Sequence, residues 1–364
     1  MGDNLRRYHA IRKALRQWCG REPQGNLARH LNTLAGLVSG IVGSQRVNLP
    51  DIASKAPDGS QRESRVKRFG RWLDNDRIEA EVYYLPFVRE LLSGLARLGT
   101  LVLVIDGSEV GRQCVTLLLS VLYKGRALPL VWVVVPGSKG HFPDATHQQL
   151  VEQVQPLLPA EADVLFLGDG EFDGIGLQAA VAAAGWHYVC RTAHNVQVCD
   201  AGEWFTLEEV DIAPGHTLGL PDALFTEAAY GPVLVIARWD AHYQHPLYLV
   251  TNLDLVAEAC YWYRKRPTIE TFFSDQKSRG FRLDKSHLSD PQRLARLMIA
   301  ACLAYLWIVF LGAVALRDGW LHRIHRAQRC DLSLFRLGLA LLEHFLNEGL
   351  PLPVAFCMPA QQCP

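Results

Sequence analysis

Three acidic residues have the spacing and the surroundings of a divalent-cation site. Asp106 follows the apolar run LVLVI, and Asp169 follows VLFLG in the same manner. Strands that are apolar on both faces lie in the middle of a sheet, and ligands bind at the ends of such strands. Two carboxylates that converge there repel each other unless a cation lies between them, and their oxygens select Mg²⁺ or Mn²⁺. The alternative is that each aspartate caps a turn before the glycine that follows it.

The third acid, Glu270, lies in a segment that also contains two cations and a phenol. These four side chains are spaced as residues on one face of a helix would be. The neighbours of Glu270, Phe272 and Phe273, would point away from that polar face into a core. A carboxylate flanked by cations suits a bound phosphodiester, and the alternative is a solvated helix face with ion pairs. At about 100° per residue, one continuous helix would hold within a stripe of about 60° the residues Tyr263, Arg266, Glu270 and Lys277.

The spacing Y-x2-R-x3-E-x6-K, together with Asp106 and Asp169, resembles the DDE transposases of bacterial insertion sequences. More specifically, it is similar to insertion-sequence family four, the YREK group. The resemblance covers nearly the whole chain, from ESRVKRFGRWLDND through VIDGSEV and LFLGDGEFDG to IETFFSDQKSRGF. The YREK spacing is the specific part of this resemblance, because each aspartate motif alone is weak.

This resemblance implies a ribonuclease-H-like catalytic core and a defined chemistry. Asp106, Asp169 and Glu270 would bind two Mg²⁺ ions, for which Mn²⁺ can substitute, and these ions would activate water and later a 3′-hydroxyl. Relatives cut double-stranded DNA at the terminal inverted repeats of a transposon through a hairpin intermediate. They join the ends to target DNA and act as a homodimer. The phosphates near the transposon end would be held by Tyr263, Arg266 and Lys277.

Two details of the resemblance are open. Pro267 departs from the family pattern, and proline is tolerated only in the first turn of a helix. The helix is therefore expected to start near Arg266, which would leave Tyr263 in a preceding turn. In relatives an aromatic residue stacks on a flipped base, for which Trp239 and Tyr248 are candidates, although either could equally be a cross-strand core aromatic.

The elements that must position these residues form a mixed α/β fold. We expect strands at 101–106, 115–123, 128–137, 163–169 and 186–192, with helices at 146–158 and 175–184 and a tight turn at Gly107. The predicted domains are a helical DNA-end-binding domain at 1–95 and a ribonuclease-H-like catalytic domain at 96–364. The second contains a β-rich insertion at 196–252 and C-terminal helices at 285–350.

The N-terminal region concentrates positive charge. Residues 1–77 carry fifteen Lys and Arg against seven Asp and Glu, although the whole chain has a formal net charge of zero. Helices are expected over 5–44 and 80–98, and Pro57-Asp58-Gly59-Ser60 predicts a turn before a basic helix over 61–73. A helix, a turn and a basic helix suit DNA contact, but a solvated helical surface has the same pattern. The candidate DNA contacts are Arg62, Arg65, Lys67, Arg68 and Arg71.

Residues 297–316 form an apolar run of twenty residues without a charge. This is long enough to cross a membrane, but a helix buried on all sides in a core has the same composition, and we favour the buried helix. The nine cysteines include no C-x-x-C pair, and the N-terminus lacks an apolar secretory run. We therefore expect a cytoplasmic protein that carries no membrane anchor.

The resulting interpretation is a metal-dependent, cut-and-paste DNA transposase. The alternatives are a catalytically inactive or domesticated transposase that only binds DNA, a nuclease of the same fold that never joins strands, and a protein anchored in a membrane by 297–316. Four other acids near the motifs could support the three site acids through hydrogen bonds, but we interpret them as ordinary surface or capping residues, an interpretation that is weakest for Glu171 and Asp173. The four acids are Glu109, Glu171, Asp173 and Asp275.

Overall fold

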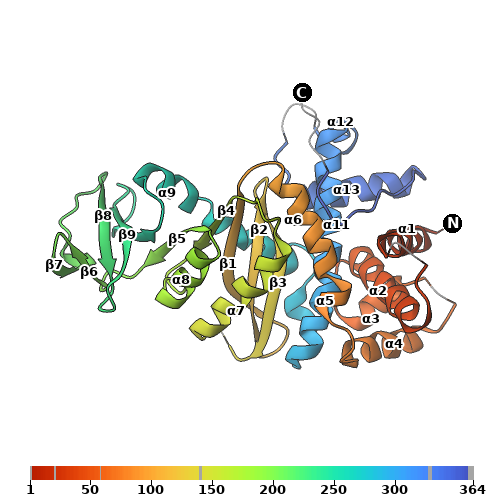
Figure 1. Ribbon diagram of the computed structural model, residues 1–364. Helices are drawn as coiled ribbons and strands as arrows, with labels where there is room; N and C mark the ends of the chain where they lie inside the picture. The colour runs from red at the N-terminus through yellow and green to blue at the C-terminus, as the bar shows by residue number, and fades with distance from the viewer. Residues whose placement is uncertain (1, 20–21, 58, 139–141, 327–329, 360–364) are drawn as a thin grey trace.

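The computed structural model describes residues 2–19, 22–57, 59–138, 142–326 and 330–359. Figure 1 shows one sheet that runs from the centre of the molecule to one end, where its last strands project away from most of the helices. The N-terminal helices gather at the opposite end. The protein is therefore a mixed α/β structure with a helical N-terminal region, as the sequence predicts.

The helical N-terminal region contains the predicted basic helix. The helix expected over 80–98 is interrupted at Tyr84, where φ is −136° and ψ is −53°. Pro86 stands in the first turn of the helix that follows, a position that proline favours, so the interruption marks a new helix start. Asp58 of the predicted turn lies outside the described residues. The helices are α1 (Asp3–Trp18), α2 (Gly25–Ser44), α3 (Leu49–Lys55), α4 (Arg62–Asp74), α5 (Ala80–Tyr83) and α6 (Leu85–Ala96).

The first five strands have the order β3-β2-β1-β4-β5. β1 and β4 are parallel, as are β4 and β5, whereas β2 is antiparallel to both of its neighbours. This order, with helices before and after β4, is that of the predicted ribonuclease-H-like core. The elements are β1 (Leu101–Val110), β2 (Cys114–Tyr123), β3 (Arg126–Pro136), α7 (Asp144–Val154), β4 (Val164–Gly168), α8 (Ile175–Ala183) and β5 (His187–Thr192).

One predicted turn is wrong. β1 does not end at Asp106 but continues to Val110, and Gly107 pairs with Leu117 inside the β1–β2 ladder. The chain turns later, at Gly111, whose φ of 58° lies in the left-handed region that glycine adopts easily. The long antiparallel pairing with β2 keeps the polar stretch after Asp106 in the strand.

The expected β-rich segment extends the same sheet. Beyond β5 the strand order continues β10-β9-β8-β6-β7. β10 pairs with β5 on one side and β9 on the other, so it joins this extension to the core. The exact domain boundaries stay predictions. The strands are β6 (Gln197–Asp200), β7 (Glu203–Thr206), β8 (Thr217–Phe225), β9 (Tyr230–Arg238) and β10 (Leu247–Thr251).

The apolar run 297–316 lies within α11 (Pro291–Arg317), the one helix among the described residues that is long and apolar enough to cross a membrane. All of its most apolar 18-residue window is buried. α11 packs against α2, β3 and the amphipathic α13 (Leu334–Asn347). α12 (Leu321–Ile324) lies between the two C-terminal helices in sequence. Packing inside the protein therefore accounts for the apolar run, as the buried-helix interpretation predicts.

Candidate active site

Asp106 and Asp169 lie at the same level on neighbouring parallel strands. Val104 of β1 is opposite Leu167 of β4, so each aspartate stands two residues beyond that pair. Residues two apart on a strand point to the same face of the sheet, and the two carboxylates therefore emerge together. Backbone amides hold both, because Gly107 N donates to Oδ1 of Asp106 at 2.7 Å and a second amide donates to Oδ1 of Asp169 at 3.1 Å.

Glu270 approaches this pair from a short helix, α10 (Ile269–Gln276). Phe272 and Phe273 are buried, at 1% and 9% exposure, which anchors α10 on the core and leaves Glu270 on its outer face. The three acids line one cavity of ≈370 Å³. Its walls are Asp106, Gly107, Ser108, Val115, Phe142, Asp169, Glu171, Arg266, Glu270 and Phe273.

Arg266 supplies the positive charge at this site. Its Nη2 lies 3.3 Å from Oδ2 of Asp106 and donates a hydrogen bond to Oδ2 of Asp169. The pKa of Asp106 is nevertheless raised to about 6, mainly by burial and also by the negative charges of Asp169 and Glu270, while Arg266 lowers it. Burial therefore outweighs the stabilising effect of the Arg266 charge on the Asp106 carboxylate.

The four residues of the YREK spacing do not share one helical stripe, and the helix start that Pro267 predicts near Arg266 is confirmed. The segment breaks into α9 (Val256–Tyr263), a 3₁₀ turn (Arg266–Thr268) and α10. Pro267 stands in the first turn after the break, because it cannot donate the backbone hydrogen bond that a continuous helix needs. Tyr263 ends the preceding helix instead of lying in a turn, and Lys277 is the residue after the end of α10.

Tyr263 and Lys277 nevertheless remain near the acids. The charges of Asp169 and Arg266 act on Tyr263, whose pKa is raised to about 12, chiefly by burial. Lys277 donates from Nζ to Oγ of Ser108 at 2.7 Å, and Ser108 lines the same cavity. The fold therefore brings the residues of the YREK spacing around one site without placing them on one helix.

The donor set suits a hard divalent cation in part. Two carboxylates project together from adjacent strands, and burial, the main cause of the raised pKa of Asp106, disfavours the charged carboxylate in the absence of a further cation. However, among the described residues no three Asp, Glu, His or Cys side chains stand close enough together to hold a metal ion. Asp106 and Asp169 thus fit a shared metal site, whereas Glu270 lines the same cavity without completing a three-carboxylate cluster.

A larger cavity of ≈840 Å³ lies between β5 and the strand extension. Both predicted base-stacking candidates line it, together with Gly170, which directly follows Asp169. Tyr248 of β10 is only 5% exposed and is opposite Ala237 of β9, so its ring is largely buried in the core. Trp239 follows β9, is half-buried and donates from Nε1 to the carbonyl oxygen of Tyr243 at 2.9 Å.

Two of the acids that we expected to be ordinary have specific structural positions. Asp275 is 3% exposed and forms an ion pair with Arg126 across 2.9 Å, so the prediction of a surface or capping acid is wrong for it. Glu171 lines the site and accepts a hydrogen bond from the Phe142 amide at 2.9 Å. Asp275 is 149 residues from Arg126 in sequence, and Glu171 is 29 residues from Phe142. No local sequence pattern indicates either contact.

His147 of α7 is a neighbour of the site that the sequence did not indicate. It is 3% exposed, and its Nε2 lies 3.9 Å from Oε1 of Glu171. Burial lowers its pKa although nearby acids raise it, which favours the neutral imidazole. In the sequence, His147 has the spacing of an ordinary core residue of a helix. Only the tertiary structure shows that it lies beside Glu171.

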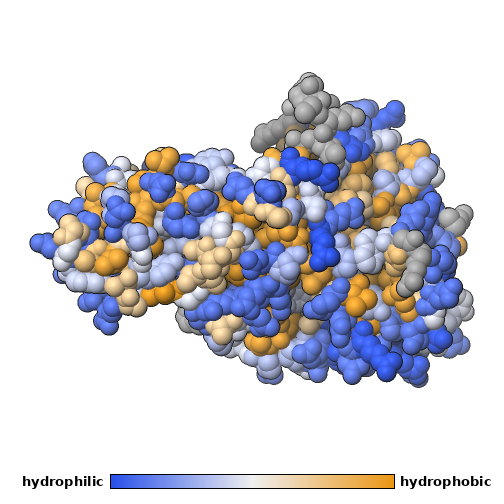
Figure 2. Space-filling model, in the orientation of Figure 1, coloured by the Kyte–Doolittle hydropathy of each residue, from blue (hydrophilic) through white to orange (hydrophobic). Residues whose placement is uncertain are grey.

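The predicted DNA-contact residues lie on α4. Arg62, Lys67, Arg68 and Arg71 are exposed, and Arg65 is half-buried. Figure 2 shows hydrophilic side chains gathered over the part of the surface where Figure 1 places α4. Phe69, Trp72 and Leu73 on the opposite side of this helix are buried, so α4 is amphipathic and presents its cations to solvent.

This chain is similar to one known protein family and, at low identity, to solved structures. The family described as "Transposase DDE domain" matches residues 98–307, more than half of the chain. A piggyBac transposase in a synaptic complex with hairpin DNA is similar with a TM-score of 0.46 and 12% identity, over 96% of this chain and 82% of that chain. The catalytic domain of human endonuclease V gives a TM-score of 0.27 and 14% identity, over 65% of this chain and 94% of that chain. No curated protein matches the sequence.

Proposed function

Since this chain belongs to the transposase DDE domain family, we propose that it is a DNA transposase that cuts at the ends of a mobile element and joins them to target DNA. The observation that carries the proposal is the cavity lined by Asp106, Asp169 and Glu270. Within the family we assign the chain to the YREK group of insertion-sequence family four, on the spacing from Tyr263 to Lys277.

The proposed catalytic residues are Asp106, Asp169 and Glu270, which would hold two Mg²⁺ or Mn²⁺ ions. When bound, these ions activate a water or 3′-hydroxyl and neutralise charge on the phosphate. The chain contributes preorganisation, because two carboxylates on adjacent strands of a rigid sheet need little rearrangement to share a ligand. Phe142 and Phe273 are largely buried and form apolar parts of the cavity wall beside the acids.

The cations around the cavity would bind the DNA backbone. Lys277 and Arg266 are the proposed phosphate ligands, with the Tyr263 hydroxyl as a further donor. Charge-assisted hydrogen bonds to phosphates beside the cut site would fix the scissile bond in line with the acids. The exposed cations of α4 would hold DNA further from the cut.

The large cavity beside Asp169 suits an unstacked base. It opens next to Gly170 and offers the indole of Trp239 as a stacking surface. A hairpin intermediate strains the duplex end, and an extruded base needs an aromatic platform of this kind. We propose Trp239 rather than Tyr248 for this role, because the tyrosine ring is largely buried in the core.

Mg²⁺-dependent nicking of duplex DNA that carries the cognate terminal repeats tests the proposal. Asp169→Asn and Glu270→Gln should each lower the nicking rate at least about 100-fold, which corresponds to about 3 kcal/mol of transition-state stabilisation. Glu161→Gln, an exposed acid before β4, is the matched control and should cut normally. Normal nicking by both site variants would contradict the proposal. DNA binding by the wild-type protein without any nicking would favour an inactive transposase that only binds DNA.

A further inference from the structure

A second, strongly basic cavity lies beyond the C-terminal end of α10. Its volume is ≈360 Å³, and four arginines line it. None of the described residues in its walls is acidic. We propose that this cavity binds a backbone phosphate of the DNA substrate, an inference that rests on the proposed function. The arginines are Arg46, Arg279, Arg282 and Arg336.

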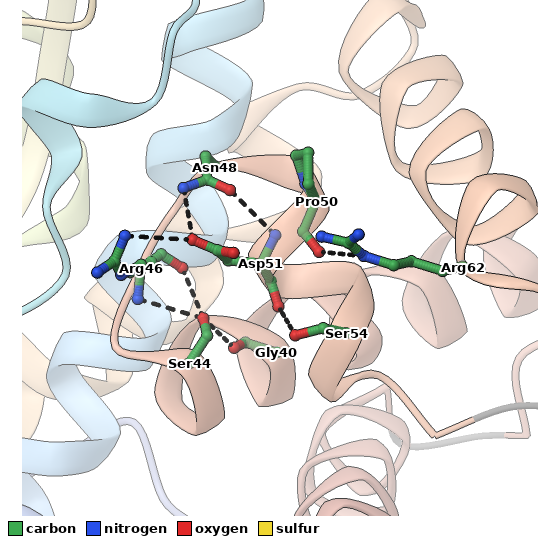
Figure 3. Close-up of polar contacts among 8 residues, drawn as sticks. All are labelled: Gly40, Ser44, Arg46, Asn48, Pro50, Asp51, Ser54 and Arg62. Carbon is green, nitrogen blue, oxygen red and sulfur yellow. Dashed lines mark hydrogen bonds and ion pairs between the residues drawn. The ribbon is translucent and has the colours of Figure 1, made fainter.

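The first wall is the turn after α2, which carries Arg46. Figure 3 shows that this turn is held by hydrogen bonds: Ser44 Oγ donates to the carbonyl oxygen of Gly40 at 2.7 Å and accepts from the Arg46 amide at 3.2 Å. Asp51 lies 3.6 Å from Nη1 of Arg46 and is itself bound by Asn48. Arg46 is still exposed, with 58% of its side-chain surface accessible, so it retains donors for a ligand.

The second wall is the loop that follows Lys277 and carries Arg279 and Arg282. The Lys277 carbonyl oxygen accepts from the Arg282 amide at 3.1 Å, and the Arg279 amide donates to Ser274 at 3.1 Å. A side chain at Gly280 would place a Cβ 2.0 Å from the carbonyl oxygen of Asp275, so only glycine permits this close return of the chain. The loop is therefore tied to the end of α10.

The third wall is the first turn of α13, which carries Arg336. Three of the four arginines, Arg279, Arg282 and Arg336, are exposed and form no side-chain hydrogen bond or ion pair with any residue that the structure describes. Asp275, the acid near Arg279 and Arg336, is already paired with Arg126. Like charges brought together without counter-ions repel, so this cavity favours an anion.

A phosphodiester suits this cavity best. Guanidinium groups bind phosphate through paired, charge-assisted hydrogen bonds. Four arginines around one cavity carry more positive charge than a single carboxylate would balance. The position agrees with this assignment. The cavity begins one residue after Lys277, and its walls join the α10 loop to the helical N-terminal region through Arg46. A duplex bound at Lys277 would therefore have this cavity beside it in the same loop.

Salt-dependent binding of a fluorescent duplex of random sequence tests the inference without knowledge of the terminal repeats. The full chain is titrated with this duplex over a range of salt concentrations, for the wild type and for the Arg279→Gln, Arg336→Gln double variant. We expect the variant to bind about tenfold more weakly and the slope of log K against log salt to become shallower by about 1 or more. Thermal unfolding of both proteins checks that the variant is folded.

Arg89→Gln is the matched control, because Arg89 is an exposed arginine of α6 that lines no part of the cavity. It should bind as the wild type does. A wild-type slope in the folded double variant would overturn the inference and leave the proposed transposase activity intact. Inorganic phosphate that stabilises only the wild type, while both proteins bind DNA equally, would also overturn it and assign the cavity to a small anion. The proposed function fails separately, if Asp169→Asn still nicks DNA.

Discussion

Arg266 donates a hydrogen bond from Nη2 to Oδ2 of Asp169, although 97 residues separate the two in sequence. The same nitrogen lies 3.3 Å from Asp106, so one guanidinium bridges both strand-borne acids. The arginine that we propose as a phosphate ligand therefore also offsets negative charge on two of the proposed metal ligands. Asp106 and Asp169 would hold a divalent cation that takes over this charge, and Arg266 would then be available to a phosphate.

Removal of Arg266 should therefore destabilise the metal-free protein more than the metal-bound one. In the presence of a chelator, Arg266→Gln should lower the free energy of unfolding by roughly 2–3 kcal/mol, because two partly buried carboxylates lose their counter-ion. Added Mg²⁺ should restore more stability to this variant than to the wild type. Denaturant titrations with and without Mg²⁺ measure both effects. Arg264→Gln, a change at an exposed neighbour, is the control. An equal loss in the two variants would contradict the prediction.

The raised pKa of Asp106 predicts a pH dependence of stability. Its carboxyl has a pKa of about 6 in the folded protein against 3.8 ordinarily, so the folded state binds more protons between these values. Stability from this group is present below about pH 4 and is lost as pH rises through 6. In chelator, Asp106→Asn should gain up to roughly 3 kcal/mol relative to the wild type between about pH 4 and pH 7. Urea unfolding at several pH values measures this difference. A gain that does not change with pH would oppose the assignment.

The two strand-borne acids could be predicted from sequence because their signal is local. An apolar run followed by Asp predicts a buried strand and the face on which the aspartate emerges, so Asp106 and Asp169 meet even though β1 continues past Asp106. The spacing alone would place Tyr263 on the helix of Glu270, but Pro267 predicts the break before that helix, and only the preceding helix that ends at Tyr263 was missed. The pairing of Asp275 with Arg126 depends on residues 149 apart, which only the packed structure brings together.

The Trp239 indole should contribute to binding of an unpaired base. Trp239→Ala should weaken binding of a hairpin or mismatched duplex by about 1–3 kcal/mol, the typical strength of base–aromatic stacking, whereas Trp239→Phe should retain most of it. The fluorescence of a 2-aminopurine at the unpaired position reports stacking directly. Trp204→Ala is the control, because Trp204 is an exposed tryptophan of β7 that does not line this cavity. Unchanged fluorescence quenching in Trp239→Ala would assign the indole to structure alone.

The buried pair of Arg126 and Asp275 should hold α10 against β3. The two side chains are 17% and 4% exposed, and removal of one partner leaves the other charge without compensation. Arg126→Met should therefore cost about 3–5 kcal/mol of unfolding free energy. Asp275→Asn should cost less, because the amide oxygen still accepts from the guanidinium and burial already raises the pKa of Asp275. Equal losses from both changes, measured in denaturant, would show that packing and not charge holds this contact.

The crossing of α11 and α13 should depend on Gly338. A Cβ there would lie 1.8 Å from the carbonyl oxygen of Ile308, and the facing Gly312 has the same constraint against Leu334. The two backbones touch at this point, so Gly338→Ala must push the helices apart and should lower the unfolding free energy by several kcal/mol, roughly 3 or more. Gly94→Ala in α6 is the opposite case, since nothing lies within 4 Å of a Cβ there. That change should raise the unfolding free energy by about 0.5–1 kcal/mol through helix propensity alone. If both alanines shift the denaturant midpoint in the same direction, the close crossing of α11 and α13 does not control stability.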